Sequence, residues 1–197
     1  MSASSWLRES AKRALFAVSL LLVLPFVALS WVEKRVLQSE AAFAFFAQLL
    51  ALVPGLPGTL LRAAYYFGTL DSCSWRTHFG FGTHFTHRGA RIADRVSSGS
   101  YCVLGHAVIG EGVRLASRVS IPSGKRQHLD DDGRMTDGTH FSEVRIGPGS
   151  WIGEGAIVLA DVGARSIVSA GAVILMPVPD NCIAGGNPAK VLREIAR

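Results

Sequence analysis

The polar segment between Ile121 and Ile146 contains the residue types best suited to acid–base chemistry. It reads PSGKRQHLDDDGRMTDGTHFSEVR, with His128 near its start and His140 near its end. Imidazole changes its protonation state close to neutral pH, so either histidine could take the proton from a hydroxyl group. Asp130 follows two residues after His128 and could accept hydrogen bonds from substrate hydroxyls. A solvated acidic loop would have the same composition, so both interpretations of Asp130 stay open.

The other histidines and the cysteines give no indication of a metal site. The four remaining histidines fall in one stretch, where we expect surface or corner positions: His78, His84, His87 and His106. A zinc site needs at least three converging side chains. The three cysteines form no C-x-x-C pair and cannot all pair with one another. We therefore expect no metal, no disulfide scaffold and a reducing compartment.

The net charge of +5 raises the question of nucleic-acid binding. Residues 1–68 hold six Lys or Arg and three Glu, whereas the remaining 129 residues hold 14 basic and 12 acidic residues. The positive excess therefore flanks an apolar stretch, where it is typical of anionic lipid contact or membrane topology. We expect no nucleic-acid partner. A composition of 49% hydrophobic and 18% charged residues also excludes a disordered chain.

A stretch of 18 residues without a charge, ALFAVSLLLVLPFVALSW, occupies positions 14–31. At about 1.5 Å per residue it is just long enough for a hydrocarbon layer of roughly 30 Å, and Pro25 could kink it. A signal peptide has a similar layout, but no small-x-small cleavage site follows. We therefore expect residues 1–40 to be a retained membrane anchor helix. Basic flanks on both sides leave open whether it spans the bilayer or lies in the interface.

A second apolar run, at positions 41–70, is interrupted by Pro54-Gly55 and Pro57-Gly58. Proline and glycine mark the ends of helices, so the run predicts two short helices joined by a turn. Its large apolar side chains are too numerous for one narrow stripe. Residues 41–70 are therefore expected to form a helical hairpin, either in the lipid head-group region or packed on the edge of the next domain.

From about residue 71 onward, aliphatic residues recur every six positions. The inward series are Val103, Ile109, Leu115 and Ile121, then Ile146, Ile152 and Val158, then Val162, Val168 and Ile174. A period of six is explained if each hexad forms one face of a triangular prism with its aliphatic residue pointing to the axis. Stacked coils of three hexads then bury a continuous core. A β-sandwich would instead show alternation and irregular strand spacing, so the sequence predicts a mainly β solenoid over residues 71–197.

Four features of this region resemble the hexapeptide-repeat acyltransferases. They are the hexads, the polar loop over residues 122–145 that begins with the broken segment SGKRQH at 123–128, the run WIGEGA at 151–156, and the tail AGGNPAK at 184–190. The loop and tail together are most similar to galactoside, maltose and exopolysaccharide O-acetyltransferases. The resemblance implies a left-handed parallel β-helix, an acetyl-CoA or other acyl-CoA donor, and a homotrimer with active sites between subunits.

The resemblance also implies roles for particular residues. His128 stands where the family has its general-base histidine. His140 is a candidate for substrate binding because of its own position near the far end of the loop. Four residues match positions of the family's coenzyme groove: Trp151, Gly153, Ala170 and Gly171. Lys190 and Arg193 are candidates for binding the coenzyme phosphates. The chain departs from the family at Leu175-Met176, where relatives often have Thr-Lys, so donor binding could depend more on the tail or accommodate a different acyl group.

Together these observations predict a membrane-associated O-acyltransferase that modifies a sugar hydroxyl of a polysaccharide, glycolipid or lipid-linked precursor. Because coenzyme A is cytosolic, the β-helix is expected to face the cytoplasm from the inner membrane. Two alternatives remain at this point. One is N-acylation of an amino sugar, and the other is a non-catalytic trimeric scaffold at the membrane.

Overall fold

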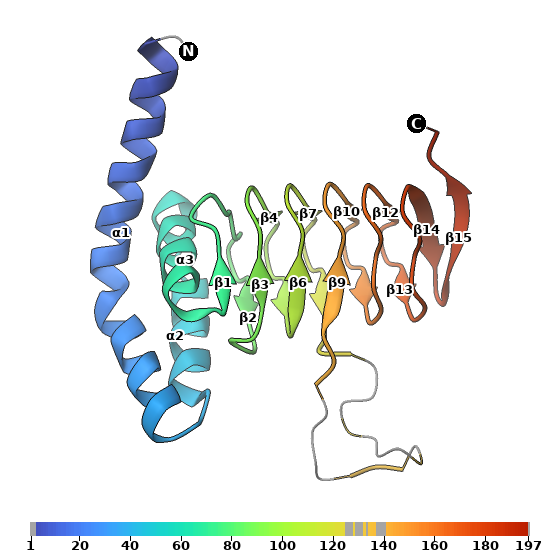
Figure 1. Cartoon of the computed structure of the whole chain (residues 1–197), viewed down its shortest axis with the longest axis horizontal. Helices are drawn as coiled ribbons and strands as arrows, with labels where there is room; N and C mark the ends of the chain where they lie inside the picture. Colours follow the sequence, from blue (N-terminus) through green and yellow to red (C-terminus); the bar gives the residue numbers. More distant parts are fainter. Residues whose placement is uncertain (1–2, 125–127, 129–131, 133, 137–140, 197) are drawn as a thin grey trace.

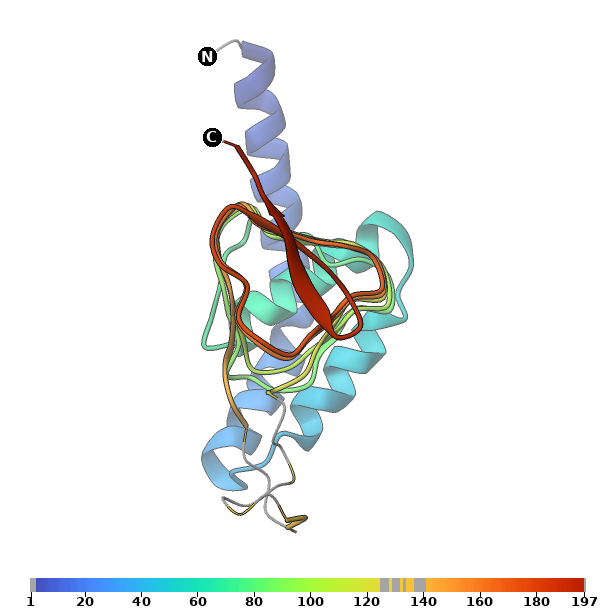
Figure 2. The ribbon, with the colours of Figure 1, turned by 90° about the vertical axis from the view of Figure 1, so that its right-hand side faces the viewer.

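Three narrow sheets wrap around one axis and enclose a triangular prism (Figure 1, Figure 2). The structure is a computed structural model, and it describes residues 3–124, 128, 132, 134–136 and 141–196. Sheet A contains β1 (Ser72–Cys73), β3 (Arg91–Ile92), β6 (Ala107–Ile109) and β9 (Val144–Ile146). Sheet B contains β4 (Ser97–Ser98), β7 (Arg114–Leu115), β10 (Trp151–Ile152), β12 (Ile167–Val168), β14 (Cys182–Gly186) and β15 (Ala189–Glu194). Sheet C contains β2 (His84–Phe85), β5 (Val103–Leu104), β8 (Ser120–Ile121), β11 (Ile157–Val158) and β13 (Val173–Ile174).

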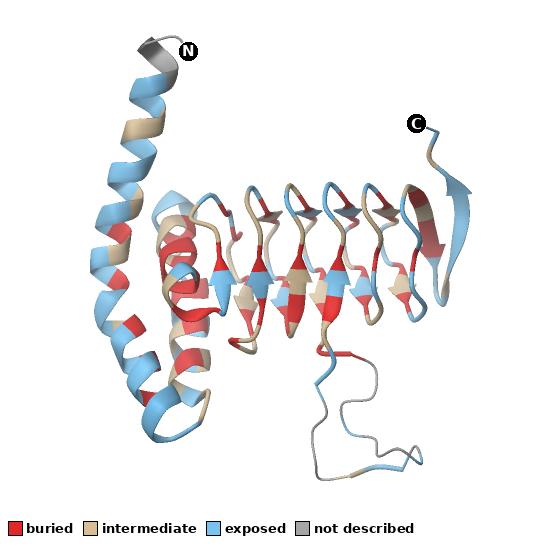
Figure 3. Cartoon of the chain, viewed as in Figure 1, coloured by how far each residue is buried: buried red, intermediate tan, exposed pale blue. Residues whose placement is uncertain are grey.

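The chain passes from sheet A to sheet B to sheet C in each coil and then returns to sheet A. Neighbouring coils pair in parallel, and only the final hairpin of β14 and β15 is antiparallel in the described residues. In a typical strand such as β7, Arg114 points outward and Leu115 is buried. The buried residues form a continuous stripe along the axis (Figure 3), and each aliphatic side chain contributes about 1.5–3 kcal/mol by leaving water.

The structure corrects the predicted position of Val103. This residue is 39% exposed, whereas its neighbour Leu104 is fully buried. The turn from β5 to β6 consists of only Gly105 and His106. The step between the inward residues Leu104 and Ile109 is therefore five residues. A strict period of six assigns Val103 to the core in place of Leu104.

Three helices close the N-terminal end of the prism, and we refer to them together as the end cap. They are α1 (Ala3–Val36), α2 (Ala41–Ala51) and α3 (Gly55–Thr69), with α1 on the outside (Figure 1). Tyr66 of α3 packs edge-on against Phe79 and Phe85 of the first coil. The buried guanidinium of Arg62 donates hydrogen bonds to four carbonyl oxygens, those of Phe79, Leu50, Ala51 and Val53. The end cap and solenoid therefore share one core.

A buried ion pair fastens the C-terminal part of α1 to the solenoid. The Glu33 carboxylate accepts hydrogen bonds from the Arg88 guanidinium at 2.5 Å and from the backbone N–H groups of Ala42 and Phe43. Arg88 also donates to the carbonyl oxygen of Ser30. Since the two charged side chains are only 5% and 6% exposed, this network joins α1, the start of α2 and the first coil.

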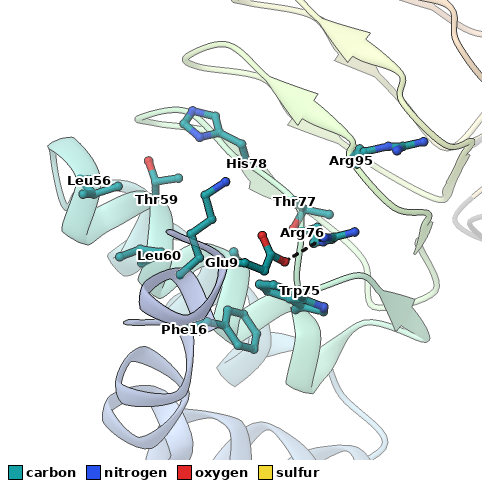
Figure 4. A pocket seen from close by; sticks show the side chains of 12 residues that line it. Glu9, Phe16, Leu56, Thr59, Leu60, Trp75, Arg76, Thr77, His78 and Arg95 are labelled. Carbon is teal, nitrogen blue, oxygen red and sulfur yellow. Dashed lines mark hydrogen bonds and ion pairs between the residues drawn. The ribbon is translucent and has the colours of Figure 1, made fainter. Parts of the chain in front are cut away.

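The N-terminal part of α1 contacts the same coil. Glu9 accepts a hydrogen bond from Arg76 at 2.8 Å, and the Phe16 ring lies 5.9 Å from the Trp75 ring (Figure 4). A cleft of about 520 Å³ lies beside these contacts, between α1, α3 and the first coil. Among the described residues, α1 is also the helix that is long and apolar enough to cross a membrane, judged by length and composition. It is nevertheless held to the first coil near both ends.

Candidate active site

The predicted loop leaves the prism at the corner between sheets C and A, which we call the loop corner. It departs after β8 and returns at β9 (Figure 1). At its root the Ser142 N–H donates to the Ser123 carbonyl oxygen at 2.9 Å. His128 is exposed, and its carbonyl oxygen accepts a hydrogen bond from the Thr136 N–H at 3.0 Å. Asp130 and His140 lie outside the described residues.

Two further histidines occupy the loop corner in the preceding coils. His87 lies between β2 and β3, and His106 lies between β5 and β6, so the two coils place these residues one above the other. Their ring centroids are 5.1 Å apart, and the Phe141 ring from the returning loop lies 4.2 Å from His87. Burial and then the His87 imidazole lower the pKa of His106. From the sequence, both histidines are expected at corners or on the surface, with no functional role.

His87 also has an acidic partner in the end cap. Its Nδ1 atom lies 2.7 Å from Oε2 of Glu40, the residue that directly precedes α2. The two residues are 47 positions apart, and no sequence motif connects them. Only the packing of the end cap on the first coils brings them together.

The predicted donor-binding residues lie elsewhere on the prism, on sheet B and at the corner that leads to sheet C. Strand register aligns Trp151, Ile167, Ile183 and Arg193 in one row across four strands. At about 4.8 Å per strand, Trp151 and Arg193 are roughly 14 Å apart. Both side chains are exposed, so an extended ligand could contact the two ends of this row.

The small residues of the predicted coenzyme groove have structural roles. A Cβ atom on Gly153 would lie 2.5 Å from the backbone nitrogen of Ala170, so glycine permits the close stacking of two coils. Gly171 has a φ of +67°, which favours glycine at this turn. Gly185, the partner of Lys190 in the final hairpin, lies beside the same corner, since a Cβ atom on it would lie 2.8 Å from the Ser169 hydroxyl oxygen. These contacts explain the glycines without a ligand.

Within one chain, the structure does not bring His128 and the predicted donor residues together. The loop corner and the corner between sheets B and C are at opposite ends of the short strands of sheet C. Leu175 and Met176, the departure from the family pattern, are exposed at the loop corner after β13. In the described part of the chain, no group of three or more His, Cys, Asp or Glu is arranged to hold a metal ion.

The prism of hexads with a protruding polar loop is a left-handed parallel β-helix of the hexapeptide-repeat type. No protein-family model matches the sequence. The chain is 33% identical over 112 residues to serine acetyltransferase 2 of Arabidopsis thaliana, and 32% identical over 92 residues to galactoside O-acetyltransferase of Escherichia coli strain K12. These alignments cover 54% and 44% of this chain, and 31% and 43% of the two relatives. The chain thus spans less than half the length of either relative.

Solved structures show the same architecture. A maltose O-acetyltransferase from Clostridium difficile 630 matches with a TM-score of 0.69 at 21% identity, covering 80% of this chain and 87% of that one. A hexapeptide-repeat acetyltransferase of Vibrio cholerae O1 biovar eltor, solved with acetyl-CoA, gives a TM-score of 0.59 at 23% identity, covering 78% and 86%. The comparisons confirm the predicted resemblance. The chain's relatives are acetyltransferases, and its fold is that of the hexapeptide-repeat acetyltransferases.

Proposed function

We propose that this chain transfers an acyl group, most simply acetyl, from coenzyme A to a sugar hydroxyl of a polysaccharide, glycolipid or lipid-linked precursor. One observation carries the proposal: a solenoid related to acetyltransferases is interrupted by a loop that presents the exposed imidazole of His128. The galactoside O-acetyltransferase relative supports a sugar acceptor. The Vibrio cholerae structure with acetyl-CoA supports the donor.

In the proposed reaction, His128 takes the proton of the acceptor hydroxyl as the oxygen attacks the thioester carbonyl carbon. The C–S bond then breaks, the acyl group remains on the acceptor oxygen, and the sulfur of coenzyme A leaves as a thiol with the proton that His128 returns. Lys190 and Arg193 would bind the phosphate groups of the donor. The pantetheine arm would follow Trp151 and the corner formed by Gly153, Ala170 and Gly171.

We further propose that the active enzyme is a homotrimer. His128 and the donor residues occupy different corners of one prism, so a site that uses both needs two neighbouring chains. Cyclic symmetry would bring the loop corner of one prism to the donor-binding corner of the next and repeat the contact three times. The three end caps would then lie at the same end of the assembly.

The end cap is proposed to dock on the cytoplasmic face of the inner membrane with α1 in the membrane plane. Glu9–Arg76 and Glu33–Arg88 hold both ends of α1 to the first coil, so a spanning α1 would pull polar groups of that coil into the bilayer. The outward face is apolar and exposed: Leu15, Val18, Leu22, Leu29, Val32, Phe45 and Leu52. Basic residues flank it at Lys12, Arg13, Lys34 and Arg35, as expected for anionic head groups.

The activity is tested by incubating the full chain with acetyl-CoA and a panel of glycan acceptors while free thiol is measured. All three cysteines are buried, and burial raises the pKa of Cys73 to about 12, so the protein itself should contribute little thiol signal. Acceptor-dependent thiol release together with an acetylated product would support the proposal. Donor binding without transfer to any glycan, or transfer only to amines, would contradict it.

A further inference from the structure

A pocket lined mostly by polar and charged residues lies where the end cap meets the loop corner. It has a volume of about 480 Å³ and receives residues from three separate segments. Lys34 and Glu40 come from the end cap, His87 and His106 from the first coils, and Phe141 from the returning loop. Neither the proposed base His128 nor any proposed donor residue lines this pocket. No sequence pattern predicts a binding or catalytic role for Glu40, His87, His106 or Phe141.

The Glu40 carboxylate fixes the orientation of the His87 ring. Oε1 of Glu40 accepts the Arg88 backbone N–H at 3.0 Å, and Oε2 lies 2.7 Å from Nδ1 of His87. With the proton on Nδ1, the ring donates to Glu40 and its Nε2 atom is a hydrogen-bond acceptor. Among the described residues, no hydrogen-bond partner of this Nε2 atom is found. The pair therefore leaves an oriented acceptor at the pocket.

Aromatic rings form the adjacent wall of the pocket. The rings of His106 and Phe141 lie 5.7 Å apart and nearly parallel, with an interplanar angle of 11°. Gly89 leaves room for the His106 ring, since a Cβ atom there would lie 2.3 Å from its Cε1 atom. Flat rings beside hydrogen-bonding groups suit a sugar, whose C–H faces pack on rings while its hydroxyls donate and accept hydrogen bonds.

The charges of the pocket favour a neutral ligand. Lys34 lies 3.7 Å from Asp71, and Arg88 is paired with the buried Glu33 carboxylate. Glu40 adds a negative charge directly at His87. A phosphate would therefore meet carboxylates and cations that are already paired, whereas a neutral hydroxyl group would meet hydrogen-bonding partners.

We propose that this pocket binds a neutral sugar ring of the acceptor, with a sugar hydroxyl donating to Nε2 of His87. The inference rests on the proposed function and adds to it a binding site separate from His128. The pocket is next to the loop and also at the edge of the end cap. A membrane-bound glycolipid could therefore place its polar head here while its lipid part stays in the bilayer.

The test measures the binding of neutral methyl glycosides of galactose, glucose, mannose and N-acetylglucosamine to the full chain. The protein is held in a detergent without a sugar head group, and saturation-transfer NMR detects binding in the absence of acetyl-CoA. The ¹⁵N resonances of the histidine rings identify the residue that is contacted. We expect at least one glycoside to bind and to shift the His87 resonance, with galactose 6-phosphate at least about tenfold weaker.

Three variants separate recognition from folding. His87→Gln removes the oriented acceptor, and Glu40→Gln lets the His87 ring carry its proton on Nε2, which is then a donor. Each variant should weaken glycoside binding about tenfold or more. Gly89→Ala keeps every polar group but displaces the His106 ring, and it should also weaken binding. His84→Gln is the matched control, since His84 lies on the same coil outside the pocket, and it should bind normally.

Acetyl-CoA binding and glycan acetylation are measured on the same samples. If no glycoside binds, or if binding leaves the His87 resonance unchanged and survives Glu40→Gln, the pocket is not an acceptor site, even when acetylation proceeds. Tighter binding of the phosphorylated sugar would also overturn the inference. If glycosides bind at His87 but no acyl transfer occurs, the proposed function fails and the sugar site stands.

Discussion

At the scale of single residues, His128 is the group on which the proposed chemistry depends. Replacing it with alanine should lower kcat by about 10² to 10⁴, the usual contribution of general-base catalysis. Acetyl-CoA affinity should change far less, because the donor residues lie at another corner of the prism. Steady-state kinetics and donor titration of His128→Ala check this, with His84→Ala as a control. A larger loss in His140→Ala would instead place the base at the far end of the loop.

The loop and the Glu40–His87 pair differ in how far the sequence predicts them. The break in the hexads predicted the protruding loop that carries His128, because a solenoid places its irregular segments outside the stacked coils. The Glu40–His87 pair had no such signal. Its members are 47 positions apart and meet only after the end cap packs on the prism. His87 and His106 lie one above the other because strand register pairs Phe85 with Leu104, and each histidine follows its paired residue by two positions.

At the scale of structural elements, the Glu33–Arg88 network should control attachment of the end cap. Burial alone would raise the pKa of Glu33, but hydrogen bonds from Ala42, Phe43, Ser39 and Arg88 outweigh it, and the pKa is lowered from its ordinary value of 4.5. A lowered folded-state pKa means that this stabilisation is present above about pH 4.5 and is lost as the pH falls through the folded-state value. Acid should therefore loosen the end cap.

Glu33→Gln tests this attachment at neutral pH. It leaves Arg88 buried without its closest carboxylate and should lower the free energy of unfolding by about 3 kcal/mol. Trp31, whose indole N–H donates to the Gly68 carbonyl oxygen, supplies a fluorescence signal from the end cap during denaturation. Glu154→Gln removes an exposed ion pair with Arg118 and should change stability little. Equal effects of the two variants would contradict the assignment.

The stacked coils give a second prediction at this scale. Gly153→Ala places a methyl group 2.5 Å from the next coil's backbone and should destabilise the solenoid by about 1–3 kcal/mol. Gly155→Ala is the control, because Gly155 has a φ of +68° but open space around its Cβ position, so it isolates the backbone conformation from the steric contact. A lower Tm for Gly153→Ala supports the stacking role. A normal Tm with weaker acetyl-CoA binding would indicate a role in the donor groove.

The strands were predictable from the sequence because each inward hexad residue is a local signal. An error such as the one at Val103 displaces the predicted inward residue by only one position. The arrangement of the end cap was not. Residues 14–31 are apolar on every side, so their pattern does not distinguish a face that packs on α3 from a face that meets lipid. Polar residues near the helix ends, Glu9 and Glu33, determine the orientation through partners in the first coil.

At the scale of the whole molecule, the proposed site requires more than one chain. We expect light scattering in a mild detergent to give the mass of three protomers. Mixing His128→Ala chains with chains that carry Trp151→Ala and Arg193→Ala should then restore part of the activity, because some interfaces combine an intact loop with an intact donor row. A monodisperse monomer with full activity, or no recovery in mixed trimers, would contradict a shared site.

The orientation of the whole molecule on the membrane is tested through the two ends of α1. If α1 lies in the membrane plane, single cysteines introduced as Arg8→Cys and Leu37→Cys should both react with an impermeant maleimide added to sealed inside-out vesicles, because both ends face the cytoplasmic side. The three native cysteines are buried and should leave the background low. Labelling of one end only until the vesicles are permeabilised would show that α1 spans the bilayer, and its contacts with Arg76 and Arg88 would then have to open on insertion.

The exposed apolar face of α1 is tested by flotation with anionic vesicles. Leu22→Glu with Val32→Glu should reduce flotation, since both side chains are on this face. High salt should weaken membrane binding further by screening the basic flanks.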